Sequence, residues 1–152
     1  MTFKTTMAVI AATMLLMPSA LAEDLKKAQR DLEKVRQVVN NFSHENQICS
    51  AYYYFVRQCL LNRDPTDPLA ETYKAGGDTF LKRSIDTGKI IGISQKALSA
   101  RMDIAIANLK SETESDCVNV SVLLKKHAQQ CKLLFEDGPG SFADAMGRLG
   151  IK

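Results

Sequence analysis

The sequence predicts an all-α protein, an up-and-down antiparallel bundle of four to five helices stapled by two inter-helix disulfides. Apolar residues recur at spacings of three and four along most of the chain, which is the period of an amphipathic helix. No segment of useful length alternates between apolar and polar residues, as a half-buried strand would. The four cysteines lie in two of the predicted helices. Short polar loops between these segments favour antiparallel neighbours.

The N-terminus predicts a secretory signal peptide, residues 1–22, that is cleaved after Ala22. A basic residue, Lys4, precedes a short apolar stretch, and small residues stand at Ala20 and Ala22. The apolar stretch is shorter than the roughly 20 residues of a bilayer span, so we expect no membrane span in the mature chain. The remaining residues, 23–152, are expected to form a single helical domain that is periplasmic or secreted.

The charge favours no polyanionic partner. The chain has 20 Lys and Arg against 17 Asp and Glu, a net charge of +3 that falls to +2 when Lys4 is removed with the leader. Charges of both signs are interspersed, so no strong field attracts nucleic acid or an anionic membrane surface. We expect no nucleic-acid partner.

The first predicted helix starts at Glu23 and has a charged outer face. Its apolar stripe consists of Leu25, Ala28, Leu32, Val35, Val39 and Phe42. Asn40, Asn41 and Ser43 then break the pattern, and Ser43 is expected to cap a second helix. That second helix, Ile48–Leu61, is apolar around almost its whole circumference, so we expect it to be the central helix, surrounded by the others.

The third predicted helix follows a loop with two Asp-Pro pairs. Asp67 is expected to cap this helix, with Pro68 at its first position. Gly76 and Gly77 in its middle either break it or allow another helix to approach closely. Gly88 is expected to end it.

Two more helices complete the predicted bundle. Ser94 is expected to cap a helix that ends near Ser111, and the last long helix runs from 117 to 135. An Asp-Gly-Pro-Gly turn signal stops it. Residues 136–152 then form a turn and a short amphipathic tail, whose apolar side carries Phe142, Met146 and Leu149.

The cysteines of an exported chain most simply form two disulfides. Cys49 and Cys59 are about 15 Å apart along one helix and Cys117 and Cys131 about 21 Å, whereas a disulfide needs Cα atoms within about 7 Å. The bridges must therefore join the two helices. Antiparallel helices pair Cys49 with Cys131 and Cys59 with Cys117, and parallel helices give the other pairing. We favour the antiparallel version, although it leaves an axial mismatch of about 6 Å.

Three consecutive tyrosines, Tyr52, Tyr53 and Tyr54, are the most prominent candidate site. They cover about 200° of the central helix, because each residue turns by about 100°. They cannot all face one core, so at least one hydroxyl should reach water or a partner. They either separate layers of the bundle or form an aromatic wall for a ligand or a protein.

Metal and cofactor sites are not expected. His44 and His127 are candidate ligands, but in the antiparallel register His127 lies across from the tyrosines and His44 lies near the other end of the pair. The sequence has no evident catalytic set of serine, histidine and acid, and no glycine-rich phosphate loop.

Together these observations predict a non-catalytic exported protein that binds another protein or belongs to an envelope assembly. The tail either docks to this partner or packs on its own bundle. The alternative is a carrier of a small apolar ligand, with a cavity lined by Tyr52, Tyr73, Phe80 and Met102. A hydrolytic enzyme is the second alternative, and it requires a cleft that joins a histidine to a carboxylate.

Overall fold

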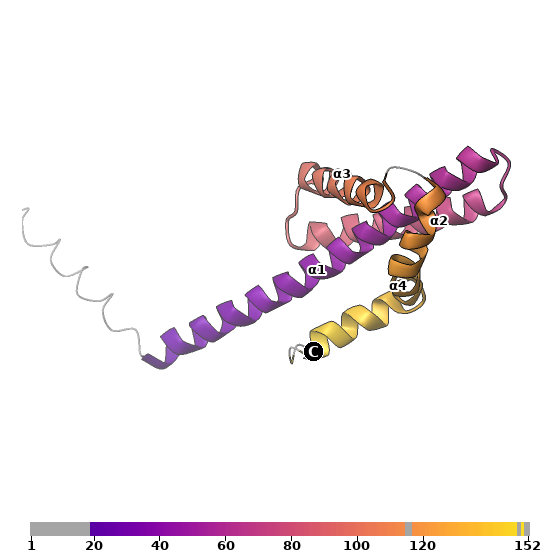
Figure 1. Cartoon of the computed structure of the whole chain (residues 1–152). Coiled ribbons are helices and arrows are strands. Elements are labelled where there is room, and N and C mark those ends of the chain that lie inside the picture. Colours follow the sequence, from indigo (N-terminus) through magenta and orange to yellow (C-terminus); the bar gives the residue numbers. More distant parts are fainter. Residues whose placement is uncertain (1–18, 115–116, 149, 151–152) are drawn as a thin grey trace, which may run out of the picture. The chain divides into compact units, whose positions relative to one another are not determined.

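The computed structural model describes residues 19–114, 117–148 and 150. This part of the chain folds into helices only (Figure 1): α1 (Ser19–Arg63), α2 (Leu69–Ile90), α3 (Gln95–Glu112), the 3-10 turn η2 (Cys117–Asn119) and α4 (Val120–Arg148). The all-α prediction is confirmed. Most of the predicted signal peptide, residues 1–18, lies outside the described residues.

The chain divides into two compact units, one ending at Lys34 and one starting at Val35. The described part of the first unit is the N-terminal portion of α1. The second unit contains the rest of α1 and all later elements. Whether residues 23–152 fold as one domain stays a prediction.

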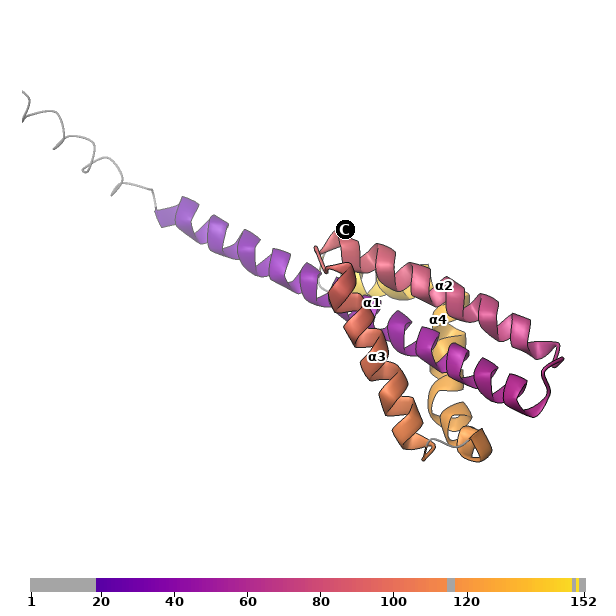
Figure 2. The same cartoon turned by 90° about the horizontal axis from the view of Figure 1, so that it is seen from above.

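Within the second unit, α2 lies alongside the last turns of α1 and runs in the opposite direction, as both views show (Figures 1 and 2). α3 and α4 run obliquely to this antiparallel pair (Figure 2). The core gathers where these helices meet, and its buried members are Cys49, Ala51, Tyr52, Val56, Phe80, Ala105, Leu109, Leu123, Cys131 and Leu134. Four of them come from the stretch predicted to be the central helix, so that part of the prediction is confirmed.

Of the two pairings that the spacing allowed, both disulfides have the favoured antiparallel one. Cys49 and Cys131 have Cα atoms 5.5 Å apart, and Cys59 and Cys117 have Cα atoms 5.3 Å apart. The predicted axial mismatch assumed that 117 and 131 share one α-helix. Cys117 instead lies in η2, before α4 begins at Val120, so the spacing of a continuous α-helix does not apply to it.

The predicted break near Ser43 is wrong, because α1 continues without interruption from Ser19 to Arg63. Ser43 is fully buried and does not cap a helix. Its Oγ donates to the carbonyl oxygen of Ser84 in α2 at 2.9 Å. A buried serine with a partner on a neighbouring helix has no need to break its own helix, since its hydroxyl is already satisfied.

Gly76 and Gly77 do not break α2; they allow α1 to approach it closely. A Cβ added at Gly76 would overlap the ring of Tyr53, and one added at Gly77 would lie 3.0 Å from Cε1 of Tyr54. The close approach brings Ser50 Oγ to 2.9 Å from the carbonyl oxygen of Gly77, to which it donates. Of the two roles predicted for these glycines, close helix packing is confirmed.

α2 starts as predicted but ends later. Asp67 Oδ1 accepts a hydrogen bond from the backbone N–H of Leu69 at 2.9 Å, which confirms Asp67 as the cap. The prediction that Gly88 ends the helix is wrong, since α2 continues to Ile90. Gly92, with φ of 75°, makes the left-handed turn, and the N–H of Ile93 bonds back to the carbonyl of Gly88 at 3.0 Å. This is the arrangement of a Schellman motif.

α3 has the predicted cap, because Ser94 Oγ accepts from the N–H of Ala97 at 3.2 Å. Gly88, predicted to end a helix, is buried where α2 meets α3. A Cβ there would lie 3.1 Å from Cδ2 of Leu98. Gly88 is therefore a packing position.

α4 consists of two helices that meet at a kink at the predicted turn signal, so the prediction that the long helix stops there is confirmed. Asp137 has non-helical φ and ψ of −129° and 29°, and helix continues on both sides of it to Arg148. Proline at 139 has no N–H to donate to the carbonyl four residues earlier, that of Phe135. Arg83 of α2 donates instead, through Nη2 to the Phe135 carbonyl at 3.4 Å and through Nη1 to the Leu134 carbonyl at 3.0 Å.

Candidate functional site

The three tyrosines separate into three environments, as their angular spread predicted. Tyr52 is 2% exposed and belongs to the core. Tyr53 packs edge-on against Tyr52, with ring centroids 5.3 Å apart, and lies 5.4 Å from the ring of Phe80 and 5.3 Å from that of Tyr73. Tyr54 turns towards the surface, where its hydroxyl donates to Asp78 Oδ1 at 2.5 Å.

The residues proposed to line a ligand cavity belong to the core cluster or pack against it. Phe80 is fully buried, and Tyr53 stands between it and Tyr73. Met102 is partly buried against the same core. A ligand in this place would have to separate rings that are already packed, which is unfavourable because the ring contacts would be lost.

Burial also raises the pKa values of the three consecutive tyrosines. The pKa of Tyr52 rises well above its ordinary value because burial penalises the phenolate, and Tyr73 adds to this effect. The pKa of Tyr54 rises from 10.0 to about 12, first through burial and second through its hydrogen bond to Asp78. The pKa of Asp78 is lowered by Lys74, whose Nζ donates to Oδ2 at 2.8 Å, and by Tyr54.

The raised pKa of Tyr54 predicts a loss of stability in alkaline solution. A group that binds its proton more tightly in the folded state stabilises the fold below its unfolded pKa of 10.0, and this contribution is lost as the pH rises towards about 12. Asp78→Asn should lower the pKa of Tyr54, because the carboxylate that opposes ionisation is gone. Tyrosinate absorbance measured against pH, with Tyr54→Phe to assign the signal, tests this. An unchanged titration in the asparagine variant would contradict it.

A set of buried polar side chains on α1 is not predicted from the sequence. Ser43, Gln47 and Ser50 are at most 1% exposed, although each is polar. Gln47 Nε2 donates to the carbonyl of Leu98 in α3, at 2.5 Å, as the two serines donate to carbonyls of α2. Their spacing of four and three residues was the available signal, since it places all three on one face of the helix.

The two histidines lie in separate places, as the antiparallel register predicted. The ring of His127 is 6.0 Å from that of Tyr52, and its Nε2 is 3.4 Å from Glu112 Oε2. His44 lies in a different groove of about 350 Å³, between α1 and α3, which Arg101 also lines. The described residues bring together no group of three or more His, Cys, Asp or Glu placed to hold a metal ion.

The tail packs against its own chain. The ring of Phe142 lies 5.0 Å from that of Phe42, and both Phe142 and Met146 are partly buried. Leu149 lies outside the described residues. Docking of this segment to a partner stays a prediction, and it would compete with the contact to Phe42.

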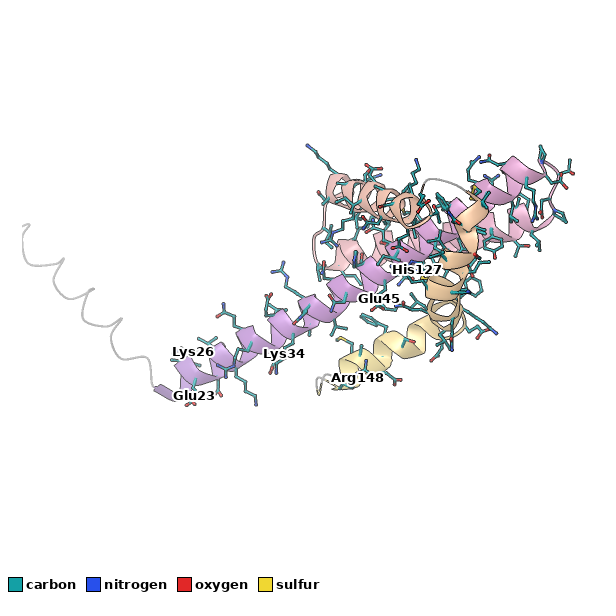
Figure 3. All side chains as sticks on the ribbon, viewed as in Figure 1. Glu23, Lys26, Lys34, Glu45, His127 and Arg148 are labelled. Atoms are coloured by element: carbon teal, nitrogen blue, oxygen red, sulfur yellow. A yellow bond between two sulfur atoms is a disulfide. The ribbon has the colours of Figure 1, made fainter. Side chains whose placement is uncertain are left out.

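The first unit has an exposed apolar surface. Leu25 and Leu32 are 57% and 60% exposed, and Ala28 between them is exposed as well. We call these three residues the Leu25 face. The opposite side of the helix is charged, and Figure 3 shows the side chains of Lys26 and Lys34 projecting away from the helix.

Comparison of the chain with protein families, with characterised proteins and with solved structures found no match. None of the helices that the structure describes has both the length and the apolar character needed to cross a membrane. The two disulfides are typical of a protein from an oxidising environment outside the cytoplasm.

Proposed function

We propose that this protein is an exported, non-catalytic module that binds another protein through the Leu25 face of α1. The observation that carries the proposal is the exposure of Leu25 and Leu32, more than half of each side chain, on one side of a helix. Every residue from 23 to 30 is exposed in this unit. These first turns of α1 bury no apolar face of their own, and most helical stability in proteins comes from such burial, so a partner that covers the face stabilises them.

The spacing of the face suits a partner helix. Leu25 and Leu32 are seven residues apart, with Ala28 between them, which is the pattern of one side of a coiled coil. Covering each leucine contributes about 1.5–3 kcal/mol before the cost of association. The small Ala28 lets the partner approach closely.

Charge beside the face specifies the partner further. Asp24 and Asp31 directly precede the two leucines and lie along the same flank, whereas the opposite flank has the neutral Gln29 and, seven residues later, Arg36. The complementary partner is an amphipathic helix with Lys or Arg beside its apolar stripe. A second copy of this chain can pair Asp31 with Arg36 but leaves Asp24 opposite Gln29, so it matches these charges only in part.

Photocrosslinking in the native cells tests the proposal. A benzophenone amino acid replaces Leu25 or Leu32 in one set of variants, and Lys27 or Arg30 on the opposite side of the helix in the control set. We expect both leucine positions to give the same adduct with one other polypeptide, and the controls to give none. Peptide mapping of the adduct should find a helix with a basic flank.

Three results would contradict the proposal: no adduct from either leucine, equal adducts from the control positions, or an adduct of two copies of this chain. The double variant Leu25→Glu, Leu32→Glu is expected to lose binding to the partner. This double variant should keep its helix content and unfolding midpoint in the second unit, yet lose the crosslink from a benzophenone placed at Ala28.

Export itself gives a separate prediction. The signal pattern and the disulfides support removal of residues 1–22 on the way to an oxidising compartment. The mature chain should therefore start at Glu23. Intact mass of the protein from its own cells, denatured but not reduced, should match residues 23–152 with four hydrogens lost to two disulfides. A chain that keeps Met1, or that has free thiols, would contradict export.

A further inference from the structure

The two disulfides differ in their access to solvent. Cys49 and Cys131 are each 1% exposed and belong to the core. Cys59 is 7% exposed, and Cys117 is partly exposed in η2. The two bridges close loops of 82 and 58 residues, and the chain entropy depends only on the logarithm of loop length. Loop length therefore gives the two bridges similar stabilising effects.

A groove lies directly at the accessible bridge. It has a volume of about 320 Å³ and includes both sulfur-bearing residues, with lining from Val56, Leu60, Arg63, Val118 and Val120. Asn62 Nδ2 approaches Cys117 Sγ at 3.9 Å from the same side. Solvent and a small molecule can therefore reach Cys117 through this groove, whereas the core encloses the other bridge.

We propose that the Cys59–Cys117 bridge is a thiol–disulfide exchange site for small thiols and dithiols. A thiolate attacks Cys117 Sγ, the more exposed sulfur, and forms a new bond to it. The Cys59–Cys117 bond breaks, and Cys59 leaves as a thiolate that takes up a proton. A second thiolate, or the second thiol of a dithiol, then attacks the mixed disulfide and releases Cys117. The reductant becomes a disulfide, and its two electrons reduce the cystine to two thiols.

Exchange at this bridge loosens one end of the fold while the other end stays fixed. Cys59 is near the end of α1, and Cys117 is in the turn that precedes α4. Without their bond, η2 and the start of α4 lose their covalent link to α1. Cys49–Cys131 still links the middle of α4 to α1, and Leu123 between Cys117 and Cys131 is fully buried. The accessible bridge is thus a local switch, and the buried bridge maintains the core.

Differential alkylation of the full oxidised protein tests the inference. The native protein is exposed to graded dithiothreitol, quenched with an alkylating reagent, digested and analysed by mass spectrometry. We expect Cys59 and Cys117 to be labelled at least about tenfold faster than Cys49 and Cys131, since the buried pair must wait for the core to open. With reduced glutathione, the mixed disulfide should form on Cys117.

Unfolded protein in guanidinium is the control, and there both pairs should be labelled at similar rates. A Cys59→Ser, Cys117→Ser variant should leave the buried pair as protected as in the parent. Simultaneous labelling of all four cysteines in the native protein, or earlier labelling of Cys49 and Cys131, would overturn the inference. Glutathione found on Cys59 alone would overturn the assignment of Cys117 as the attacked sulfur.

Discussion

Replacing Cys49 and Cys131 together by alanine should lower the free energy of unfolding by about 4.5 kcal/mol, the chain-entropy value for a loop of this length. The bridge joins residues separated by 82 positions, and both of its cysteines are 1% exposed. Its loss therefore raises the conformational entropy of the unfolded chain and also leaves a cavity in the core. Urea unfolding of the oxidised variant and its parent measures the difference.

The matched control for this variant is the double alanine variant of Cys59 and Cys117. Its chain-entropy term is similar, because its separation is 58 residues. Cys117 is partly exposed, whereas Cys59 is 7% exposed, so this variant should add a smaller cavity penalty than the loss of two cysteines that are each 1% exposed. A smaller loss of stability in the Cys49 and Cys131 variant than in this control would contradict the assignment of the core bridge.

Phe80→Ala should lower the free energy of unfolding by about 3–5 kcal/mol, the range for a buried phenylalanine. Phe80 is fully buried, and its ring lies 5.4 Å from that of Tyr53 and 5.8 Å from that of Phe135. Arg83 lies over the same ring at 5.9 Å. The substitution removes the common neighbour of side chains from α1, α2 and α4. Thermal and urea unfolding both report the loss.

Phe135→Ala is the control for that prediction. Phe135 belongs to the same cluster, but it is 44% exposed. Its truncation should cost clearly less than that of Phe80, because much of its ring surface is already in water. Equal losses for the two variants would mean that Phe80 is not the centre of the cluster.

The sequence predicted the features that simple geometry determines. The disulfide pairing followed from two distances along helices and from the preference of neighbouring helices to run antiparallel. The different environments of Tyr52, Tyr53 and Tyr54 followed from their angular spread around the helix. The caps at Asp67 and Ser94 followed from side chains that accept a bond from a backbone N–H close in sequence. Each of these inferences needs only local or pairwise information.

The wrong predictions concern residues whose role depends on a distant segment. Ser43 has the chemistry of a helix cap, but Ser84 supplies a partner for its hydroxyl 41 residues away. Either Gly88 or Gly92 could end a helix. Gly88 instead packs against Leu98, and Gly92 makes the left-handed turn. The Leu25 face was predicted as part of a buried stripe, because periodicity alone does not say which turns of an amphipathic helix are covered.

The contact of Arg83 with the bend in α4 constrains the length of α2. The two carbonyls that Arg83 binds lie on another helix, so its guanidinium must stand at one angular position on α2. Inserting or deleting a single residue between Gly77 and Arg83 would turn that side chain by about 100° around the helix axis. The bend would then lose its donor even though every residue in α4 were unchanged. Natural variants of this protein should therefore tolerate substitutions on the outer face of α2 far better than changes in its length.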